Sequence, residues 1–493
     1  MEPAGTLERG LMVLRACAAD PGRRTRATDL VRATGLARAT VDRAVDTLVR
    51  LGYLRAEGRD VLLAPRLMEL GEAYLTGGGL RDALAPLAGE LARELAEPVS
   101  LAVQDGDAVR FIAQFTRRRT MSIVFRVGDR LPADRCAAGL ALLDPAAPWA
   151  EDDQLIEPGL IAVALPVRGP DGKAVCALSV VSHTSRHTVA GLAAHALPRM
   201  RETVARMEAA LAGPPPEPRP AVRAAGPADG GLQSLARGLS VLVALGSAVG
   251  GASLADAART TGLPRASVRR AVHTLERLGY AAADGNRYVL LPKVLELGYA
   301  PLSARTLREI VQPHLADLVA RVRESASVAV LSGDDVVYVA RVPTVSIMSV
   351  DITVGTRFPA YATSMGRVLL ADQPAERLAS IVPRPLSRYT VTSPAELGAV
   401  IRQAAADGYA LVDQELEEGV RSIAVPVRGP GGRTVAAVNV ATHASRATPA
   451  DLLRDVLPAL AEAAARMEAD LTHVRDHPHT LAEEDGPDAP RSS

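Results

Sequence analysis

The sequence predicts an α+β protein in which two winged helix-turn-helix domains are each followed by a larger domain of strands and helices. Residues 255–281 read as two helices joined by a tight turn, and residues 29–54 repeat that pattern. Gly35 then corresponds to Gly262 and Gly52 to Gly279, a constant spacing of 227 residues. This spacing far exceeds the periods of solenoid repeats, so it indicates duplication of a whole multi-element unit.

The second helix of each pattern has one apolar stripe and one polar face. In the later copy Val268, Val272 and Leu275 recur at helical spacing, and Pro264 stands near the expected helix start. A helix of this kind can lie in the major groove, where arginine and hydroxyl side chains meet base edges and phosphates. The residues predicted to contact DNA are Arg38, Thr40, Arg43 and Thr47 in the earlier copy, and Arg265, Ser267, Arg269, Arg270 and His273 in the later one.

Local charge and a following hairpin support DNA binding over an ordinary solvated helix. Residues 255–281 carry five arginines against two acidic residues, in a chain whose formal net charge is zero. The segment 281–292 then reads as a β-wing that turns at Asp284-Gly285-Asn286. Asp42 and Asp46 weaken the prediction for the earlier copy, because carboxylates are repelled by phosphates.

Apolar helices flank both patterns. Leading helices are expected at 6–18 and 234–246, with spare hydrophobic surface that could pair one copy with the other. Connecting helices are expected at 65–75 and 292–302.

The larger domain is clearest in the later half. We expect a helix at 307–325, a hairpin at 327–342 and a strand at 345–352, and then a loop that enters a helix near Ser364. Helical patterns at 374–382 and 394–407 precede two strands joined at Pro430-Gly431-Gly432 and a terminal helix at 449–471. The earlier half repeats this order but lacks 33 residues, the helical insert, between about Leu143 and Asp153.

These elements define the domain limits. We expect helix-turn-helix domains at 1–64 and 232–292, α+β domains at 65–212 and 293–475, a Pro/Gly-rich linker at 213–231 and an acidic disordered tail at 476–493.

Composition narrows the functional class. The 493 residues are 48% hydrophobic and 23% charged, which is typical of globular domains. Cys17, Cys136 and Cys176 form no pairing or metal pattern, and no apolar run is long enough for a signal core or a membrane span, so a cytoplasmic location is expected. No cofactor motif or catalytic constellation is found, and an enzyme is not expected. His183 and His443 occupy matching positions, a pattern more often structural than catalytic.

The motifs together resemble a known family. The stretches TGLPRASVRRAVHTLERLGY, YATSMGRVLLA and DQELEEGVRSIAVPV, in this order, closely resemble the IclR-type transcriptional regulators. The resemblance implies a winged helix-turn-helix joined to a GAF-like effector-binding domain. Within the family, residues 341–371 look most like the branch that controls aromatic-acid catabolism through the β-ketoadipate pathway. Such regulators respond to small carboxylates such as protocatechuate, p-hydroxybenzoate or β-ketoadipate.

The resemblance also implies an effector pocket in the later copy. The positions carried over are Thr363, Ser364, Met365, Asp413, Glu415, Ser422 and Asn439. Backbone N–H groups at the helix start near Ser364 would suit a ligand carboxylate. Arg341, Arg367 and Arg421 are further candidates, although for each one a surface or ion-pair role is the commoner reading.

The earlier copy departs from the family pattern, with Leu155 at the position of Glu415 and Ile161 at that of Arg421. We therefore expect its pocket to be degenerate and its domain mainly structural. Because one chain carries both helix-turn-helices, we expect an intramolecular pseudo-dimer on a double-stranded DNA operator, with further homodimerisation left open. The alternative is a sensor or scaffold that does not bind DNA.

Overall fold

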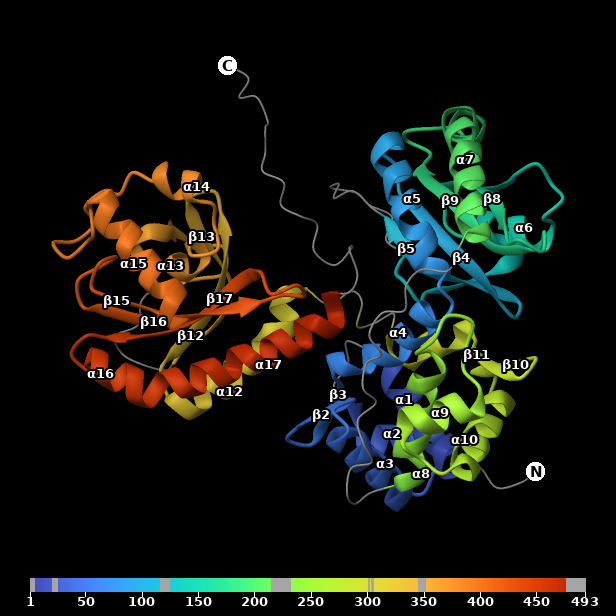
Figure 1. Cartoon of the computed structure of the whole chain (residues 1–493), viewed down its shortest axis with the longest axis horizontal. Coiled ribbons are helices and arrows are strands. Elements are labelled where there is room, and N and C mark those ends of the chain that lie inside the picture. The colour runs from blue at the N-terminus through green and yellow to red at the C-terminus, as the bar shows by residue number, and fades with distance from the viewer. Residues whose placement is uncertain are drawn as a thin grey trace. The chain divides into compact units, whose positions relative to one another are not determined.

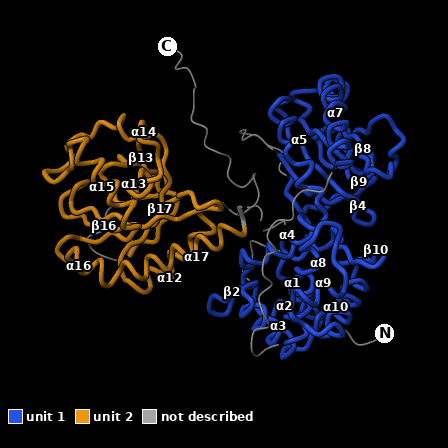
Figure 2. The backbone as a smooth tube through the Cα atoms, in the orientation of Figure 1, with its two compact units in different colours: residues 1–304 blue, residues 305–493 orange. Residues whose placement is uncertain are grey.

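The computed structural model describes residues 5–19, 25–115, 125–213, 232–299, 302, 306–344 and 352–475. The expected linker (apart from Gly213), the acidic tail and nearly all of the expected strand at 345–352 lie outside these residues. The chain forms two compact units, residues 1–304 and residues 305–493 (Figure 2). The first unit holds both helix-turn-helices and the earlier α+β domain, and the second holds the later α+β domain.

Both copies of the DNA-binding pattern fold as winged helix-turn-helices, which confirms the predicted fold class. Each consists of a leading helix, a helix-turn-helix pair and a two-stranded wing. The elements of the first copy are α1 Thr6–Ala18, α2 Ala27–Thr34, α3 Arg38–Arg50, β2 Leu54–Glu57 and β3 Asp60–Leu63, with β1 Thr25–Arg26 added to the wing. Those of the second are α8 Gln233–Leu245, α9 Leu254–Thr261, α10 Arg265–Arg277, β10 Ala281–Asp284 and β11 Arg287–Leu290.

Gly35 and Gly262 make the turn between the two helices of each helix-turn-helix pair. Each adopts φ +68°, a left-handed conformation that glycine enters without a steric cost. A glycine at this point therefore ends the first helix of the pair in both copies.

The two copies pack against each other inside unit 1. Helix α8 contacts α1, α3 and α10, and the approach of α1 to α8 is close on both sides. A Cβ built on Gly10 would lie 2.3 Å from the Leu235 side chain, and one built on Gly238 would lie 2.4 Å from Leu7. The spare hydrophobicity of the leading helices is therefore used to pair the copies, and α3 and α10 lie at the same end of the unit (Figure 1).

The connecting segments differ between the copies. The first is η1 Pro65–Leu67 followed by α4 Met68–Gly77, which packs on α8. The second also begins as a 3-10 helix, η3 Pro292–Leu297, which is longer than η1. Gly298 ends this helix at φ +116°, where its backbone meets the side chain of Leu67.

The two α+β domains share one antiparallel sheet topology. In unit 1 the strand order is β6-β5-β4-β9-β8-β7, and in unit 2 it is β14-β13-β12-β17-β16-β15. The unit 1 strands are β4 Val99–Asp105, β5 Ala108–Phe115, β6 Arg130–Pro132, β7 Ala150–Asp153, β8 Leu160–Arg168 and β9 Ala174–His183. Those of unit 2 are β12 Ser325–Ser332, β13 Asp335–Val342, β14 Arg357–Pro359, β15 Ala410–Asp413, β16 Val420–Arg428 and β17 Thr434–His443.

Helices cover both faces of each sheet. In unit 2, α12 Leu307–Val322 and α17 Leu457–Arg475 pack together on one face, and α13 Ser364–Leu370 packs against β16 and β17 on the other. Their counterparts in unit 1 are α5 Leu80–Leu95, α7 Val189–Ala212 and α6 Ala137–Leu143. The helices α14 Ala375–Ala379 and α15 Pro394–Asp407 occur in unit 2, whereas in unit 1 the chain passes from α6 to β7 in a short connection, as the 33-residue gap predicts.

Candidate DNA interface and ligand pocket

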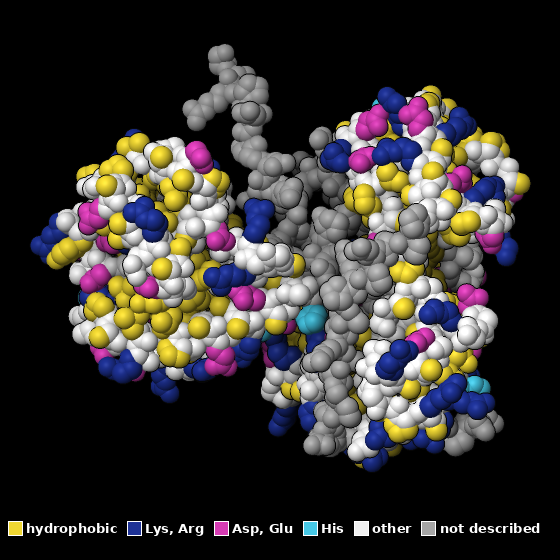
Figure 3. Space-filling model, viewed as in Figure 1, with side chains coloured by type: hydrophobic (Ala, Val, Ile, Leu, Met, Phe, Trp, Pro, Cys, Tyr) yellow, Lys and Arg dark blue, Asp and Glu magenta, His cyan; other side chains and the backbone are white. Residues whose placement is uncertain are grey.

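The second helix of each helix-turn-helix, α3 in the earlier copy and α10 in the later one, is called its reader. The later reader, α10, presents an exposed basic stripe. Arg265, Arg269 and His273 are spaced by four residues and all are exposed, so they lie on one side of the helix. Arg270 is exposed beside them and donates a hydrogen bond to Ser267 Oγ at 3.4 Å. Figure 3 shows basic side chains over the lower part of unit 1, where α10 lies in Figure 1. This surface has the charge and the hydrogen-bond donors that a major groove requires.

The earlier reader, helix α3, has the same shape but a different charge pattern. Arg38 is exposed, and its Nε donates to Asp42 Oδ1 at 2.9 Å. Arg43 is also exposed and donates to the backbone oxygen of Ala39 at 3.1 Å. Thr40 is half-buried at the start of the helix. The carboxylate of Asp42 therefore neutralises part of the positive charge on this stripe.

Thr47 was predicted to contact DNA, but the structure buries it. Its side chain is only 3% exposed, because the chain entering α8 covers it. The Thr47 hydroxyl donates to the Arg43 carbonyl at 2.7 Å and accepts from the Leu232 N–H at 2.9 Å. Sequence periodicity placed Thr47 on the polar face, but the packing of copy 2 against copy 1 buries that part of the face.

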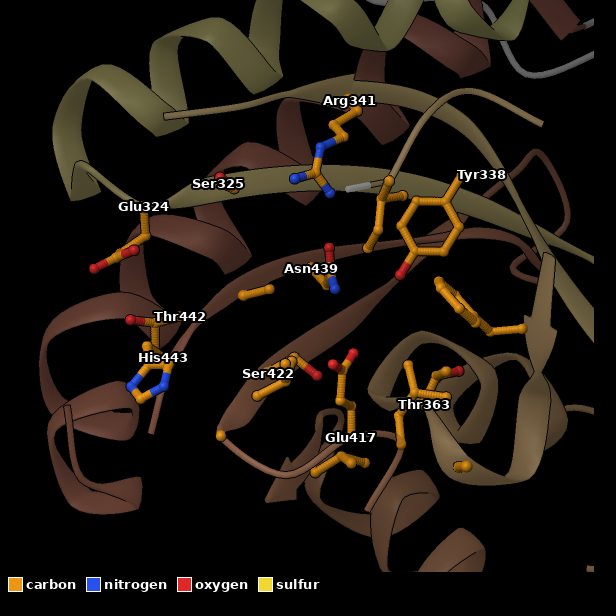
Figure 4. A pocket seen from close by; sticks show the side chains of 18 of the residues that line it. Glu324, Ser325, Tyr338, Arg341, Thr363, Glu417, Ser422, Asn439, Thr442 and His443 are labelled. Atoms are coloured by element: carbon orange, nitrogen blue, oxygen red, sulfur yellow. The ribbon is translucent and has the colours of Figure 1, made fainter. Parts of the chain in front are cut away.

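Unit 2 contains a pocket of about 670 Å³ between its sheet and the start of α13. Apolar walls are formed by Ile352, Phe358 and Leu416 among others. Figure 4 shows Arg341, Tyr338 and Asn439 directed into the same space, with Glu417 and Ser422 on the side opposite Arg341. Polar and charged groups, among them Glu324, Glu418 and Arg446, complete the lining, and polar groups that converge on a concave site beside an apolar wall are typical of small-molecule sites.

The sheet register determines the polar side of this pocket. Ser327 on β12 stands directly opposite Arg341 on β13 and Asn439 on β17, so the three side chains share one face across adjacent strands. Asn439 is 4% exposed, and its Oδ1 has no hydrogen-bond partner. Thr442 Oγ1 at the same pocket is also buried without a partner. Buried polar atoms without partners are costly, and a bound ligand or water would satisfy them.

Tyr338 adds a hydroxyl to the pocket. Burial raises the pKa of Tyr338 to about 12, against the smaller opposing effect of nearby Arg341. The phenol is therefore neutral near pH 7, and it can donate a hydrogen bond to a ligand.

Three of the seven predicted effector residues line the pocket, namely Thr363, Ser422 and Asn439. Met365 is fully buried in the core of unit 2. Ser364 is also fully buried, and its Oγ lies 2.8 Å from Ser422 Oγ. The start of α13 is capped internally, because Thr363 Oγ1 accepts from the Gly366 N–H at 3.0 Å. This cap thus occupies the Gly366 N–H, and the expected carboxylate site on N–H groups near Ser364 stays a prediction.

Asp413 and Glu415 lie outside the pocket lining because each is paired with an arginine. Asp413 accepts two hydrogen bonds of 2.9 Å from Arg421. Glu415 accepts from Arg367 in a pair that is almost fully buried. Of the three arginines proposed as carboxylate partners, Arg341 lines the pocket, whereas Arg367 and Arg421 hold these acids in place.

Several lining residues were missed by the sequence analysis, among them Tyr338, Phe358 and Glu417. Tyr338 lies three residues before Arg341 on β13, and the strand has a register shift opposite Val328/Ala329. A simple alternation of faces therefore does not place both residues toward one cavity. Glu417 belongs to the DQELEEG motif, but nothing in its spacing distinguished it from Glu415.

In the earlier copy the corresponding positions hold a buried apolar cluster. Phe111 stands where unit 2 has Tyr338, and its ring stacks on Phe125 at 5.0 Å. Cys136 replaces Thr363, and Ala162 replaces Ser422. Burial raises the pKa of Cys136 to about 11, so its thiol is protonated. All three cysteines are buried and unpaired, as expected.

Family profiles match both halves of the chain. The profile described as the IclR helix-turn-helix domain matches residues 6–58 and 234–285, and the one described as the bacterial transcriptional regulator IclR C-terminal matches residues 72–156 and 299–469. The chain belongs to the IclR family of transcriptional regulators. The first C-terminal match ends just after the predicted gap, and the repeated pair of domains shows the tandem duplication.

Relatives and solved structures each correspond to about half of the chain. It is 45% identical over 234 residues to the Pca regulon regulatory protein of Pseudomonas putida, covering 46% of this chain and 80% of that protein. It is 32% identical over 238 residues to the p-hydroxybenzoate hydroxylase transcriptional activator of Acinetobacter baylyi, covering 46% and 88%. A putative transcriptional regulator from Rhodococcus sp. RHA1 shares 49% identity, with 49% and 99% coverage and a TM-score of 0.46.

The comparisons thus confirm the family that the motifs predicted, and its branch related to aromatic catabolism. No described helix is long and apolar enough to cross a membrane.

Proposed function

We propose that this regulator controls genes of aromatic-acid catabolism and responds to a small carboxylate bound in the pocket of unit 2. The observation that carries the ligand class is Arg341, a guanidinium in a pocket whose lining also has apolar walls, three glutamates and the unpartnered Asn439 Oδ1. A guanidinium binds a carboxylate through two parallel hydrogen bonds. The relationship to a p-hydroxybenzoate hydroxylase activator supports an aromatic ring on the apolar side.

The earlier α+β domain has a structural role in this proposal. Phe111 and Ala162 belong to a buried apolar cluster on which Phe125 packs, at positions that line the pocket in unit 2, and Gln114 stands at the position of Arg341. A carboxylate has no cationic partner there. One ligand site per chain follows.

The pair of helix-turn-helices forms the DNA-binding part of this regulator. Their packing through α1 and α8 makes one chain a pseudo-dimer, and half-sites about 34 Å apart, one helical turn, would suit two such readers. A ligand changes DNA affinity only if it binds two conformers of the regulator unequally. The ligand in unit 2 therefore acts by favouring one arrangement of the chain.

Calorimetric titration of the full chain with p-hydroxybenzoate, protocatechuate and β-ketoadipate tests the pocket. We expect one site per chain for at least one of these acids, and an affinity about ten-fold to one-hundred-fold lower for Arg341→Gln, because a hydrogen bond to a charged group is lost. Arg402→Gln, an exposed position on α15, is the matched control and should bind as the wild type does. Two equal sites per chain, or unchanged affinity in Arg341→Gln, would contradict the proposal.

A further inference from the structure

The two readers differ in charge on the stripe that faces outward. In α10 the residues at successive four-residue steps are Arg265, Arg269 and His273. In α3 the corresponding residues are Arg38, Asp42 and Asp46. With histidine neutral, the first stripe carries two positive charges, and the second carries one positive and two negative charges. The flanking arginines, Arg270 and Arg43, are the same in both readers.

These differences bear directly on the bases that each helix can accept. Arginine pairs with the two acceptors on the major-groove edge of guanine, whereas a carboxylate accepts from the amino group of cytosine and is repelled by the guanine acceptors. Asp42 and Asp46 are also repelled by phosphates. Asp46 is exposed and Asp42 is half-buried against Arg38, so both carboxylates remain on the DNA side of α3.

Some of the contacts that hold the two readers in one unit have no counterpart in the opposite direction between the copies. Arg277, at the end of α10, donates to Glu8 on α1 at 2.6 Å, but the equivalent pair in the other direction is Arg50 with Ala236. Tyr299 donates to Glu72 at 2.5 Å across the same boundary. Copy 1 and copy 2 thus contact each other within one chain, and every chain presents one reader of each kind.

From these observations we infer that the protein binds its operator in a single orientation. Helix α10 takes a half-site that presents guanine to Arg269, and α3 takes a half-site that presents the amino group of cytosine, or of adenine, to Asp42. A regulator built from two identical chains has two equivalent orientations on a palindrome. Here the reversed placement sets carboxylates against guanine acceptors, at a loss of about ten-fold in affinity for each base contact that is misread. This inference rests on the proposed DNA-binding function.

Two steps test the inference. The full-length chain first selects duplexes from a pool of random DNA, and directed cleavage then locates each wing on the selected DNA. An iron chelate that cleaves DNA is attached to a cysteine introduced at a wing turn, Arg59→Cys in copy 1 or Asn286→Cys in copy 2. The native cysteines are buried and do not compete for the label. We expect two unlike half-sites in the selected DNA, each cleaved from only one of the two wings. Cleavage of both half-sites from each wing, or selection of a symmetric palindrome, would overturn the orientation while leaving DNA binding established.

Exchange of the reader residues gives a second measurement. The exchanged chain carries four substitutions, Asp42→Arg, Asp46→His, Arg269→Asp and His273→Asp. It should select the same two half-sites with the cleavage pattern reversed. Arg308→Asp, an exposed position in unit 2, changes charge outside the readers and should leave the pattern as it is. An unreversed pattern in the exchanged chain would refute the assignment of Asp42 and Arg269. If no duplex is enriched by the wild-type chain, the proposed regulator function fails together with this inference.

Discussion

Glu415 shows how a residue of a family motif can act beside a pocket without lining it. Its carboxylate pairs with Arg367, and its side chain also accepts from the Val391 N–H at 3.2 Å. Its backbone oxygen accepts from Thr390 Oγ1 at 2.7 Å. These bonds hold the loop before α15 against the end of β15. In the earlier copy, which lacks that loop, leucines stand at both positions, Leu140 and Leu155.

We predict that Glu415→Gln lowers the stability of unit 2. Removing one partner of a buried ion pair leaves the other charge uncompensated, and we expect a loss of about 3–5 kcal/mol in the free energy of unfolding. The double variant Arg367→Leu with Glu415→Leu removes both charges and should lose less than Glu415→Gln alone. Urea denaturation followed by circular dichroism measures both. Weakened ligand binding in Glu415→Gln with unchanged stability would instead assign Glu415 to the effector.

Among the secondary-structure elements, helices α4 and α8 approach each other closely at glycine residues. A Cβ on Gly246, just after α8, would lie 2.1 Å from the backbone oxygen of Ala73, within α4. Since backbone atoms cannot turn aside as a side chain can, this close approach requires glycine. The contact joins the DNA-binding copy 2 to the helix that leads into the earlier α+β domain, so it stabilises unit 1 as a whole.

Gly246→Ala should therefore destabilise unit 1 by about 1–3 kcal/mol, as overpacking typically does, and weaken operator binding. Gly5→Ala is a matched control, because no atom lies within 4 Å of its Cβ position. Thermal unfolding and gel-shift titration report the two effects. Wild-type stability in Gly246→Ala would mean that α4 and α8 do not hold this contact in solution.

For the whole molecule, the division into two units separates the helix-turn-helices from the pocket. Both readers belong to residues 1–304, and the pocket lies within residues 305–493. A ligand that binds only the folded form of one unit stabilises that unit by an amount set by its concentration and affinity.

Saturating ligand should thus raise the unfolding transition of unit 2 and leave that of unit 1 unchanged. At one hundred times its dissociation constant the gain is about 2.7 kcal/mol. Differential scanning calorimetry with and without p-hydroxybenzoate, or the acid that binds best, measures the shift. An equal rise in both transitions would indicate a second ligand site in the earlier α+β domain.

Much of this architecture was predictable from local sequence. Periodicity and turn chemistry are local properties, and they placed the two helix-turn-helices, the wings and the long strands of each sheet, whereas the short strands β6, β7, β14 and β15 were not predicted. The positions of Gly35 and Gly262 followed from a turn that glycine favours. Thr363, Ser422 and Asn439 were predicted by resemblance and do line the pocket, although their contact with an effector is still a prediction.

The remaining features depend on which surfaces meet, and these are properties of the tertiary structure alone. Thr47 looks like a DNA contact until Leu232, 185 residues later, covers it. The sequence offers Arg341, Arg367 and Arg421 as equivalent candidates. The sheet register assigns Arg341 to the pocket. The positions of Glu415 and Asp413 assign the other two arginines to ion pairs. The sequence by itself determined two unequal readers and one intact ligand domain. The folded chain decided which polar side chains remain available, because burial and pairing depend on neighbours that are distant in sequence.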